Sequence, residues 1–359
     1  MSDRLGVLLM TYGSPAADLH DLAEYLAAVR GGRAAPDELV AEFRRRYELI
    51  GGSPLIPITR DQAAAVAEQL QRDGVAASGT VGMRFSSPSI ADGLRELAGL
   101  NCGTVAAIVM SPQHSDLLMG GYRRALDEAV AGLGPAAPEV HLAPAWWSHH
   151  GFIGAVAERI RTGLIGLPAD TPVLLTAHSL PRRVAEAEPG YIEQLRATAT
   201  AVAEAAGLSA DRWSFCWQSA GHEPGEWMTP DFADLMPQLR AAGHRSVLVA
   251  PIQFLADHLE ILYDVDIGAR EQAEAAGMGF ARIESLNVAP RFIRALAQVA
   301  VAAARSQAEA YGKGSPSPSV TSSAGGASTS TGSSTSERVS TAETSPTSLP
   351  ARSRATRDR

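Results

Sequence analysis

Short apolar runs alternate with amphipathic stretches along most of this 359-residue chain. Several runs, such as VAAIVM at residues 105–110, are apolar throughout, which is typical of strands that are buried on both faces. The stretches between them repeat apolar residues at helical spacing. This alternation predicts an α/β fold in which helices cover parallel sheets. Strands are expected at residues 5–10, 81–85, 105–110, 140–143, 173–177, 213–217, 247–251 and 281–283.

Eight strands could close into a single barrel, but a short internal repeat in the sequence favours two halves of four strands each. GVLLMTYGSP at residues 6–15 and PVLLTAHSLP at 172–181 share an apolar run, a threonine, a polar ring and a turn. Ligands of open α/β sheets bind at the carboxyl ends of strands, where Tyr12 and His178 stand. Helices are expected at residues 18–30, 37–47, 61–72, 122–133, 152–164, 192–206 and 292–304.

Bulk composition narrows the class of protein. The chain carries 31 basic and 39 acidic residues, whereas proteins that bind nucleic acid usually have a basic surplus. Its two cysteines, Cys102 and Cys216, match no metal-binding spacing, and a disulfide framework is not expected. No apolar run approaches the ~18 residues of a membrane helix. We therefore expect a cytoplasmic protein with no transmembrane segment and no nucleic-acid partner.

The last part of the chain has a different composition. Residues 311–359 are rich in serine and threonine and have almost no large apolar side chains. Such a segment cannot bury enough apolar surface to offset the entropy lost on ordering. We therefore predict a disordered tail at 311–359 and assign it no catalytic role.

A stretch rich in carboxylates, PIQFLADHLEILYD, follows the seventh predicted strand. Asp257, Glu260 and Asp264 are spaced i, i+3 and i+7, which places them on one face of a helix. Like charges on one face of a helix repel each other and lower its stability unless a cation binds beside them. A solvated acidic face is the commoner alternative. The apolar neighbours, however, indicate a largely buried segment and favour a path for a divalent metal.

His178 follows the fifth predicted strand in TAHSLP. With Glu260 it would form a mixed nitrogen and oxygen site, which suits Fe2+ and equally zinc. Either residue could take up a proton near neutral pH. Without such a partner, a hydrogen-bonded core histidine is the favoured interpretation. A serine-hydrolase turn around Ser179 is a further alternative, but Ala177 and Pro181 stand where that motif has glycines.

Two arginine-rich stretches end predicted helices at glycine pairs. VRGGR contains Arg30, and FRRRYELIGGSPL contains residues 44–46 before its two glycines. Cations at a helix C-terminus followed by glycine are favourable by themselves. Alternatively, one arginine of the second stretch acts with Arg30 to bind a ligand carboxylate, for which a guanidinium is well suited.

Taken together, the motifs MTYGSP, VRGGR, RRYELIGGSPL, TAHSLP, WQSAG and ADHLEILYD resemble the ferrochelatases. The resemblance runs in order from about residue 5 to residue 304, and AHSLP and ADHLE at this separation form a specific pair. It implies two similar Rossmann-like (flavodoxin-like, chelatase-type) halves with parallel sheets and a porphyrin cleft between them. The halves are expected at 1–145 and 146–287, with a helix at 288–310 that packs back on the first half.

The resemblance also implies a reaction and roles for individual residues. Ferrochelatases insert Fe2+ into a porphyrin with release of two protons. By motif position, His178 and Glu260 form the metal-site pair, which accepts pyrrole protons or hands over iron. Asp264 would continue an acidic path for the metal.

Tyr12 bears on the choice of substrate. Ferrochelatases that act on coproporphyrin III tend to have tyrosine at this position, where it can ligate the iron from the other face. Protoporphyrin-type members usually have an apolar residue there. The resemblance therefore points to insertion of Fe2+ into coproporphyrin III in haem biosynthesis. The residues that match porphyrin- or propionate-contacting positions of the family are Tyr12, Arg30, Arg46, Tyr47, Ser53 and Tyr122.

This chain departs from some relatives of that family in two respects. Where they have a further acidic residue it has Gly268, so the acidic path is shorter or uses Asp266 or Glu271. Others carry an iron–sulphur cluster, but Cys102 and Cys216 cannot supply four ligands. We therefore expect neither a cluster nor another permanent cofactor, with Fe2+ as a substrate.

Two other functions stay open. One is a chelatase for protoporphyrin IX, or for another tetrapyrrole with cobalt or nickel. The other is a porphyrin or metal chaperone without turnover. His178, Glu260 and Asp264 argue against the chaperone, since storage needs no base beside the pyrroles. We expect a monomer whose partners are the porphyrin, Fe2+ and a downstream haem-pathway enzyme.

Overall fold

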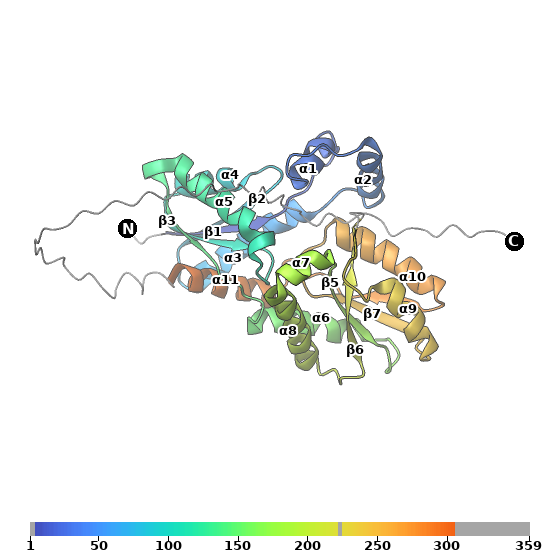
Figure 1. The fold of residues 1–359 in the computed structure, drawn as a ribbon. Helices are drawn as coiled ribbons and strands as arrows, with labels where there is room; N and C mark the ends of the chain where they lie inside the picture. Colours follow the sequence, from blue (N-terminus) through green and yellow to red (C-terminus); the bar gives the residue numbers. More distant parts are fainter. Residues whose placement is uncertain (1–3, 222–224, 306–359) are drawn as a thin grey trace, which may run out of the picture.

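The computed structural model describes residues 4–221 and 225–305, which form two four-stranded sheets (Figure 1). The strand orders are β2-β1-β3-β4 and β6-β5-β7-β8, and every neighbouring pair is parallel. The predicted α/β fold with two similar halves is confirmed, and the described residues form no single barrel. The strands are β1 (Arg4–Thr11), β2 (Ala77–Met83), β3 (Cys102–Val109), β4 (Glu139–Leu142), β5 (Val173–His178), β6 (Trp213–Gln218), β7 (Ser246–Pro251) and β8 (Gly279–Arg282).

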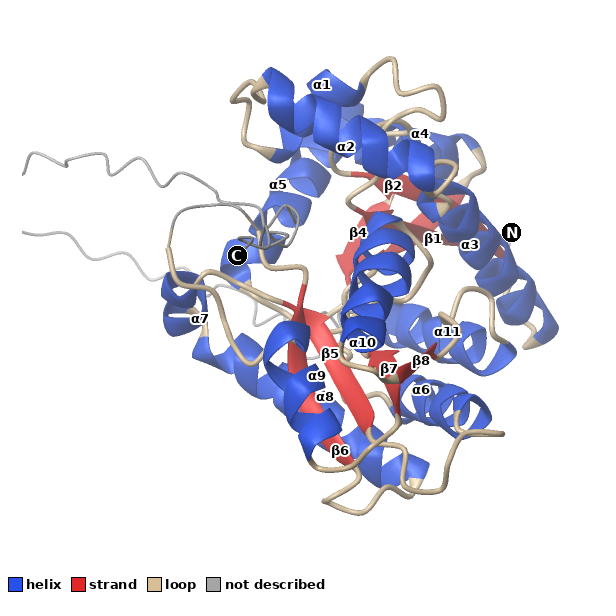
Figure 2. Ribbon diagram, turned by 90° about the vertical axis from the view of Figure 1, so that its right-hand side faces the viewer, coloured by secondary structure: helices blue, strands red, loops and turns tan. Residues whose placement is uncertain are grey.

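Helices cover the two sheets and connect their strands (Figure 2). Those that precede β5 are α1 (Leu22–Val29), α2 (Asp37–Leu49), α3 (Leu55–Arg72), α4 (Ile90–Gly99), α5 (Asp116–Leu133), the 3-10 turn η1 (Gly134–Ala136) and α6 (His150–Gly163). Those that follow it are α7 (Arg182–Ala187), α8 (Pro189–Ala206), α9 (Phe232–Ala241), the π-helix η2 (Glu260–Ala269), α10 (Arg270–Ala275) and α11 (Pro290–Arg305). None of these described helices is long and apolar enough to cross a membrane.

β2 begins at Ala77, four residues before the predicted start at 81. Its sequence, ASGTVGM, has no apolar run at its start because helices press against its glycines. A Cβ atom on Gly79 would stand 2.1 Å from the carbonyl oxygen of Ala63 in α3, and one on Gly82 would stand 2.6 Å from the Cα of Ile90 in α4. At these two glycines the backbones of α3 and α4 lie directly against the backbone of β2, where other strands pack through side chains.

The C-terminal helix α11 lies against α3 and β3 of the first half and against α6 (Figure 1). Its buried face is one side of an amphipathic helix and includes Phe292, Ile293 and Leu296. Burial of this apolar stripe joins the end of the described chain to the first sheet. Residues 306–310 of the predicted helix and the predicted tail at 311–359 lie outside the described residues.

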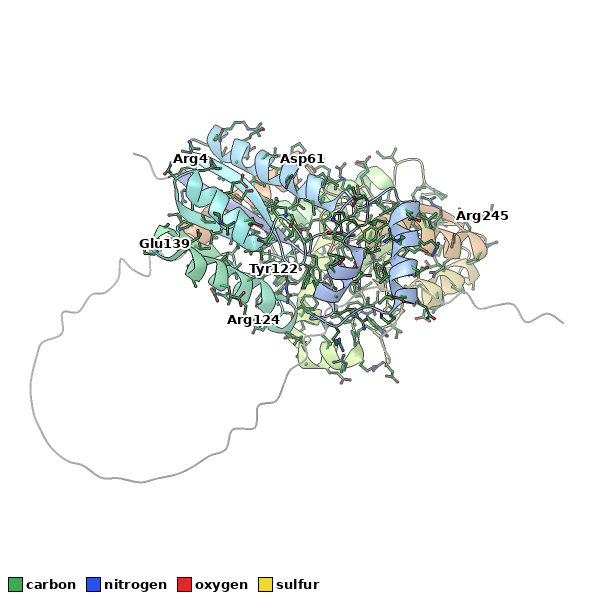
Figure 3. The ribbon with its side chains drawn as sticks, turned by 90° about the horizontal axis from the view of Figure 1, so that it is seen from above. Arg4, Asp61, Tyr122, Arg124, Glu139 and Arg245 are labelled. Carbon is green, nitrogen blue, oxygen red and sulfur yellow. The ribbon has the colours of Figure 1, made fainter. Side chains whose placement is uncertain are left out.

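The carboxyl ends of both sheets face the middle of the molecule. Figure 3 shows Arg4 and Glu139, where β1 and β4 begin, at one end, and Arg245, just before β7, at the other. Tyr122 on α5 lies between them, nearer the middle. The two strand ends that carry the repeated motifs therefore approach the same region from opposite halves.

α1 and α2 form an excursion from the first half that reaches the second. Leu22, Leu26, Phe43 and Tyr47 on these helices pack with Leu259, which lies just before the π-helix. Burial of these apolar side chains fixes α1 and α2 beside the carboxyl ends of the strands.

Candidate active site

A cavity of about 200 Å³, open to solvent, lies between the two halves at these strand ends. Apolar side chains such as Met110, Leu118 and Leu180 form much of its wall. An apolar wall with polar groups that converge on one space is typical of a small-molecule site. The polar side chains on the wall are Thr11, Tyr12, Tyr25, Tyr47, Ser53, Thr59, Gln62, Ser111 and Tyr122 from the first half, and His178, Tyr191, Gln253, His258 and Glu260 from the second.

His178, the last residue of β5, lies on the wall of this cavity. Its Nδ1 lies 2.5 Å from the carbonyl oxygen of Ser179, and a carbonyl only accepts, so Nδ1 carries the proton. Its Nε2 is buried and has no hydrogen-bond partner among the described residues. Its backbone N–H donates to the side-chain oxygen of Gln253 at 2.9 Å. The imidazole is thus held in one orientation, with Nε2 on the side of Glu260.

Glu260 stands between two histidines. Its Oε1 lies 3.7 Å from Nε2 of His178, and its Oε2 lies 3.7 Å from Nε2 of His258. The Nδ1 of His258 lies 2.9 Å from the carbonyl oxygen of Ala256, so this ring also turns its Nε2 toward the carboxylate. The predicted pair of His178 and Glu260 is therefore together, and His258 joins them. In residues 4–221 and 225–305, no group of three or more His, Cys, Asp and Glu side chains is placed to hold a metal ion.

The sequence interpretation missed His258 because it lies off the predicted carboxylate stripe. Burial alone would lower the pKa of its imidazole, but the hydrogen bond and charge of Glu260 outweigh burial and raise that pKa. The signal that could have found it is its place two residues before Glu260 in ADHLE. Tyr191 was also missed; it receives a hydrogen bond from Gln253, which also accepts the N–H of His178.

The predicted stripe of three carboxylates is shortened in the structure. Asp257 precedes the π-helix and binds a separate set of residues, whereas Glu260 and Asp264 lie on the helix itself. Asp264 is absent from the cavity wall, and its Oδ1 lies 3.5 Å from Nη1 of Arg46. Burial, together with the charge of Glu260, raises the pKa of Asp264 to about 6, although the Ser219 hydroxyl and the Arg46 charge oppose this.

Replacement of Asp264 by asparagine should change how stability depends on pH. The pKa of Asp264 is raised from 3.8 to about 6, so the fold favours the protonated carboxyl. That contribution is fully present below pH ~4 and is lost as the pH rises through ~6. Asparagine at position 264 cannot ionise. The free energy of unfolding of Asp264→Asn, relative to that of the wild type, should therefore rise by up to ~3 kcal/mol between pH 4 and pH 7.5. Urea unfolding at both pH values measures this, with the exposed Asp61→Asn as a control that shows no such gain.

The two arginines predicted to bind propionates do not line the cavity. Arg46 is fully buried, donates from Nε to Glu42 at 3.0 Å and stacks over the ring of Tyr263 at 4.7 Å. It therefore joins α2 to the π-helix across the two halves. Arg30 is half-buried at the end of α1, directly after Val29, which is on the cavity wall. The other predicted contacts, Tyr12, Tyr47, Ser53 and Tyr122, are wall residues.

Tyr12 directly follows β1, and the turn after it requires glycine at the next position. It packs against Phe85 and Tyr122, with ring centroids 5.1 and 6.3 Å away. Gly13 follows with φ of +93°, and a Cβ atom there would stand 2.1 Å from Oγ of Ser86. Tyr12 and His178 thus reach the same cavity from equivalent strand ends of the two halves.

Solved structures share this architecture. The iron-bound structure "SirB from Bacillus subtilis with Fe3+" superposes with a TM-score of 0.54 at 11% identity, covering 86% of this chain and 98% of that one. The cobalt complex of the sirohydrochlorin chelatase SirB from Bacillus subtilis subspecies spizizenii has a TM-score of 0.52 at 10% identity, covering 86% of this chain and 97% of that one. At these identities the likeness concerns the fold alone.

Sequence comparisons identify the family. The model described as "Ferrochelatase" matches residues 4–304. A ferrochelatase of Deinococcus radiodurans is 38% identical, covering 82% of this chain and 94% of the relative. The coproporphyrin III ferrochelatase of Geobacillus kaustophilus is 34% identical, over 82% and 95% respectively. That of Bacillus subtilis is 31% identical, over 83% and 97%. The chain therefore belongs to the ferrochelatase family.

Proposed function

We propose that this protein inserts Fe2+ into coproporphyrin III to give Fe-coproporphyrin III. The observation that carries the proposal is the buried Nε2 of His178. It has no hydrogen-bond partner in the described part of the chain and lies 3.7 Å from Glu260 in a cavity between two halves. Insertion breaks two pyrrole N–H bonds and forms iron–nitrogen bonds without a change of oxidation state. Two protons must therefore leave, and a fixed base beside the substrate answers that need.

In the proposed reaction, Nε2 of His178 accepts the two pyrrole protons in turn and passes each of them to water in the open cavity. The Glu260 carboxylate, at 3.7 Å, stabilises the imidazolium that forms. The same carboxylate is an oxygen ligand suited to Fe2+ before the metal enters the ring. Since chelation involves no redox step, the proposal needs no resident cofactor, and Fe2+ is a substrate.

Coproporphyrin III is favoured by the relatives and by the character of the wall. Two of the relatives named above are coproporphyrin III ferrochelatases. The wall combines apolar side chains for a flat ring with hydroxyl donors for carboxylates, among them Tyr47, Ser53 and Tyr122. Tyr12 faces the same cavity as His178, and we propose that its phenol ligates the inserted iron from the other face.

Replacement of Tyr12 by phenylalanine should narrow the preference for coproporphyrin III. If the phenol ligates iron, kcat with coproporphyrin III should fall ~10- to 100-fold, since such a loss of transition-state contact is worth ~1.4–2.7 kcal/mol. The slower insertion into protoporphyrin IX should change by less than about threefold. Tyr263→Phe, which removes a phenol outside the cavity wall, serves as the control. Unchanged turnover of coproporphyrin III by Tyr12→Phe would remove this role from Tyr12.

A protoporphyrin IX chelatase is the second candidate. The Deinococcus radiodurans relative carries the general name ferrochelatase, and the apolar part of the wall would also accept a porphyrin with fewer carboxylates. Steady-state insertion with each porphyrin separates the two candidates. Higher kcat/KM for protoporphyrin IX would replace the first proposal with the second.

A further inference from the structure

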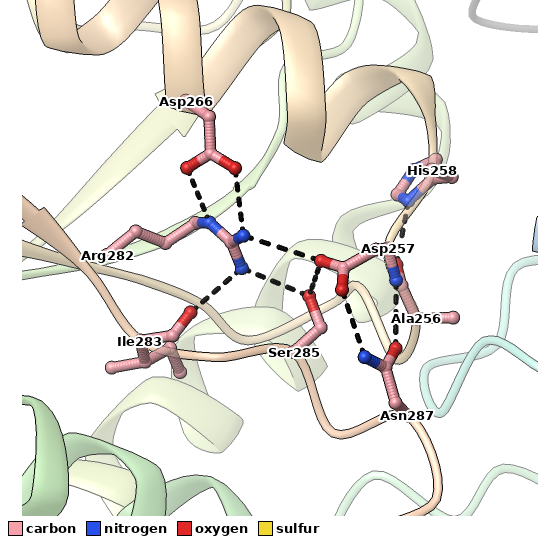
Figure 4. A network of polar contacts seen from close by, with 8 residues as sticks. All are labelled: Ala256, Asp257, His258, Asp266, Arg282, Ile283, Ser285 and Asn287. Carbon is pink, nitrogen blue, oxygen red and sulfur yellow. Dashed lines mark hydrogen bonds and ion pairs between the residues drawn. The ribbon is translucent and has the colours of Figure 1, made fainter. Parts of the chain in front are cut away.

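Arg282, the last residue of β8, is the centre of a polar network outside the cavity (Figure 4). Its Nε and Nη2 donate to both oxygens of Asp266, at 2.7 and 2.9 Å. Nη2 also lies 3.4 Å from Oδ1 of Asp257. Nη1 donates to the carbonyl oxygen of Ile283 at 2.9 Å and to the hydroxyl of Ser285 at 3.2 Å. One guanidinium therefore joins two carboxylates that lie nine residues apart.

Asp257 is held from its other sides as well (Figure 4). The hydroxyl of Ser285 donates to its Oδ1 at 2.6 Å, and the amide of Asn287 donates to its Oδ2 at 2.9 Å. Its backbone N–H donates to the side-chain oxygen of Asn287 at 3.0 Å. Gln62 of the first half donates to the carbonyl oxygen of Asn287 at 2.9 Å. The loop before the π-helix is thus anchored to both halves.

The network surrounds the segment that carries the site. Asp257 directly precedes His258, and Asp266 lies on the same π-helix as Glu260, six residues beyond it. Arg282 therefore holds this segment on both sides of Glu260. Neither Arg282 nor its two carboxylate partners is on the cavity wall, so none of them is placed to contact the substrate.

The charges make the guanidinium hard to replace. The side chains of Arg282, Asp257 and Asp266 are only 13%, 23% and 25% exposed. Without the cation, two partly buried carboxylates would face each other unpaired, which is strongly unfavourable. They would separate, and the segment between them would move. A lysine would restore the charge but not the fork that binds Asp266 through two parallel bonds.

We propose that Arg282 is a positioning residue for metal insertion, which fixes Glu260 and His258 relative to His178 through Asp257 and Asp266. This inference rests on the proposed function. Displacement of a reacting group by about 1 Å can cost ~100-fold in rate. The porphyrin is bound largely by other walls of the cavity, so the effect should fall on turnover and not on binding.

The test compares Arg282→Gln, Arg282→Lys and the wild type in Fe2+ insertion, with porphyrin binding followed by fluorescence quenching. We expect kcat of Arg282→Gln to fall ~10- to 100-fold while KM and Kd for the porphyrin stay within about threefold. Arg282→Lys should recover part of the loss. Arg159→Gln is the matched control. Arg159 binds the exposed Glu284 at 2.7 Å, and Glu284 directly precedes Ser285 of the network. The kcat of Arg159→Gln should equal that of the wild type.

The outcomes separate this inference from the proposed function. A folded Arg282→Gln variant with kcat within twofold of an active wild type would overturn the positioning role alone. Equal losses of kcat and porphyrin binding would also overturn it, since the network would then support the whole cavity. A wild type that inserts no metal would overturn both proposals. If Arg282→Gln does not fold, Asp257→Asn takes its place in the test. This variant keeps the shape of the side chain beside Arg282 but removes its charge, and it should lower kcat several-fold with KM unchanged.

Discussion

His178→Ala should lose at least ~1000-fold in the rate of iron insertion, which corresponds to ~4 kcal/mol of transition-state stabilisation. The variant removes the buried Nε2 of a cavity-wall residue and with it the base that we propose for the pyrrole protons. Binding of the porphyrin should stay within about threefold, because the hydroxyl and apolar walls are left in place. Anaerobic turnover and porphyrin fluorescence quenching measure the two quantities separately.

The control for this variant is His20→Ala, which removes an exposed imidazole that binds the surface residue Asp18. Its turnover should equal that of the wild type. Normal turnover by His178→Ala would contradict the assignment of the base. Loss of porphyrin binding in step with turnover would assign His178 to binding.

Glu260→Gln should lower turnover by ~100- to 1000-fold. Glutamine has nearly the same shape, but it neither carries the charge proposed to stabilise an imidazolium at His178, 3.7 Å away, nor offers a carboxylate to Fe2+. The KM for Fe2+ should rise as well, whereas porphyrin binding should not change. Steady-state kinetics at varied Fe2+ concentrations gives both parameters.

Glu271→Gln is the matched control for that substitution, since Glu271 is an exposed carboxylate of α10, away from the cavity wall. It also tests whether the acidic path extends beyond Asp264. Turnover unchanged in Glu271→Gln and reduced in Glu260→Gln is the expected pattern. Equal losses in both would show a longer path and would take the special role from Glu260.

Local sequence predicts the parts of the fold that depend on local apolar patterns. β5 and β7 were predicted within one residue of their observed bounds because both faces of each strand are buried. α4 was not predicted, although Ser89 and Asp92 form a capping box that marks its beginning. β2 was predicted too late because its first residues meet helix backbone and carry no apolar signal.

The site depends on contacts that sequence patterns do not contain. Residue types do not distinguish a π-helix from an α-helix. The sequence therefore could not predict that Glu260 is the first residue of a π-helix. Arg46 is turned away from the cavity because α2 of the first half packs on the π-helix of the second. His178 and Glu260 could be predicted as a pair because their motifs resemble one family, not because of their spacing.

The most direct test of the account is anaerobic insertion of Fe2+ by the full chain. The protein is mixed with Fe2+ and either coproporphyrin III or protoporphyrin IX, and the loss of the free-porphyrin absorption bands is followed. We predict catalytic turnover of coproporphyrin III with a kcat/KM at least ~10-fold above that for protoporphyrin IX, a difference of ~1.4 kcal/mol. Binding of both porphyrins without insertion into either would contradict the account and indicate a chaperone.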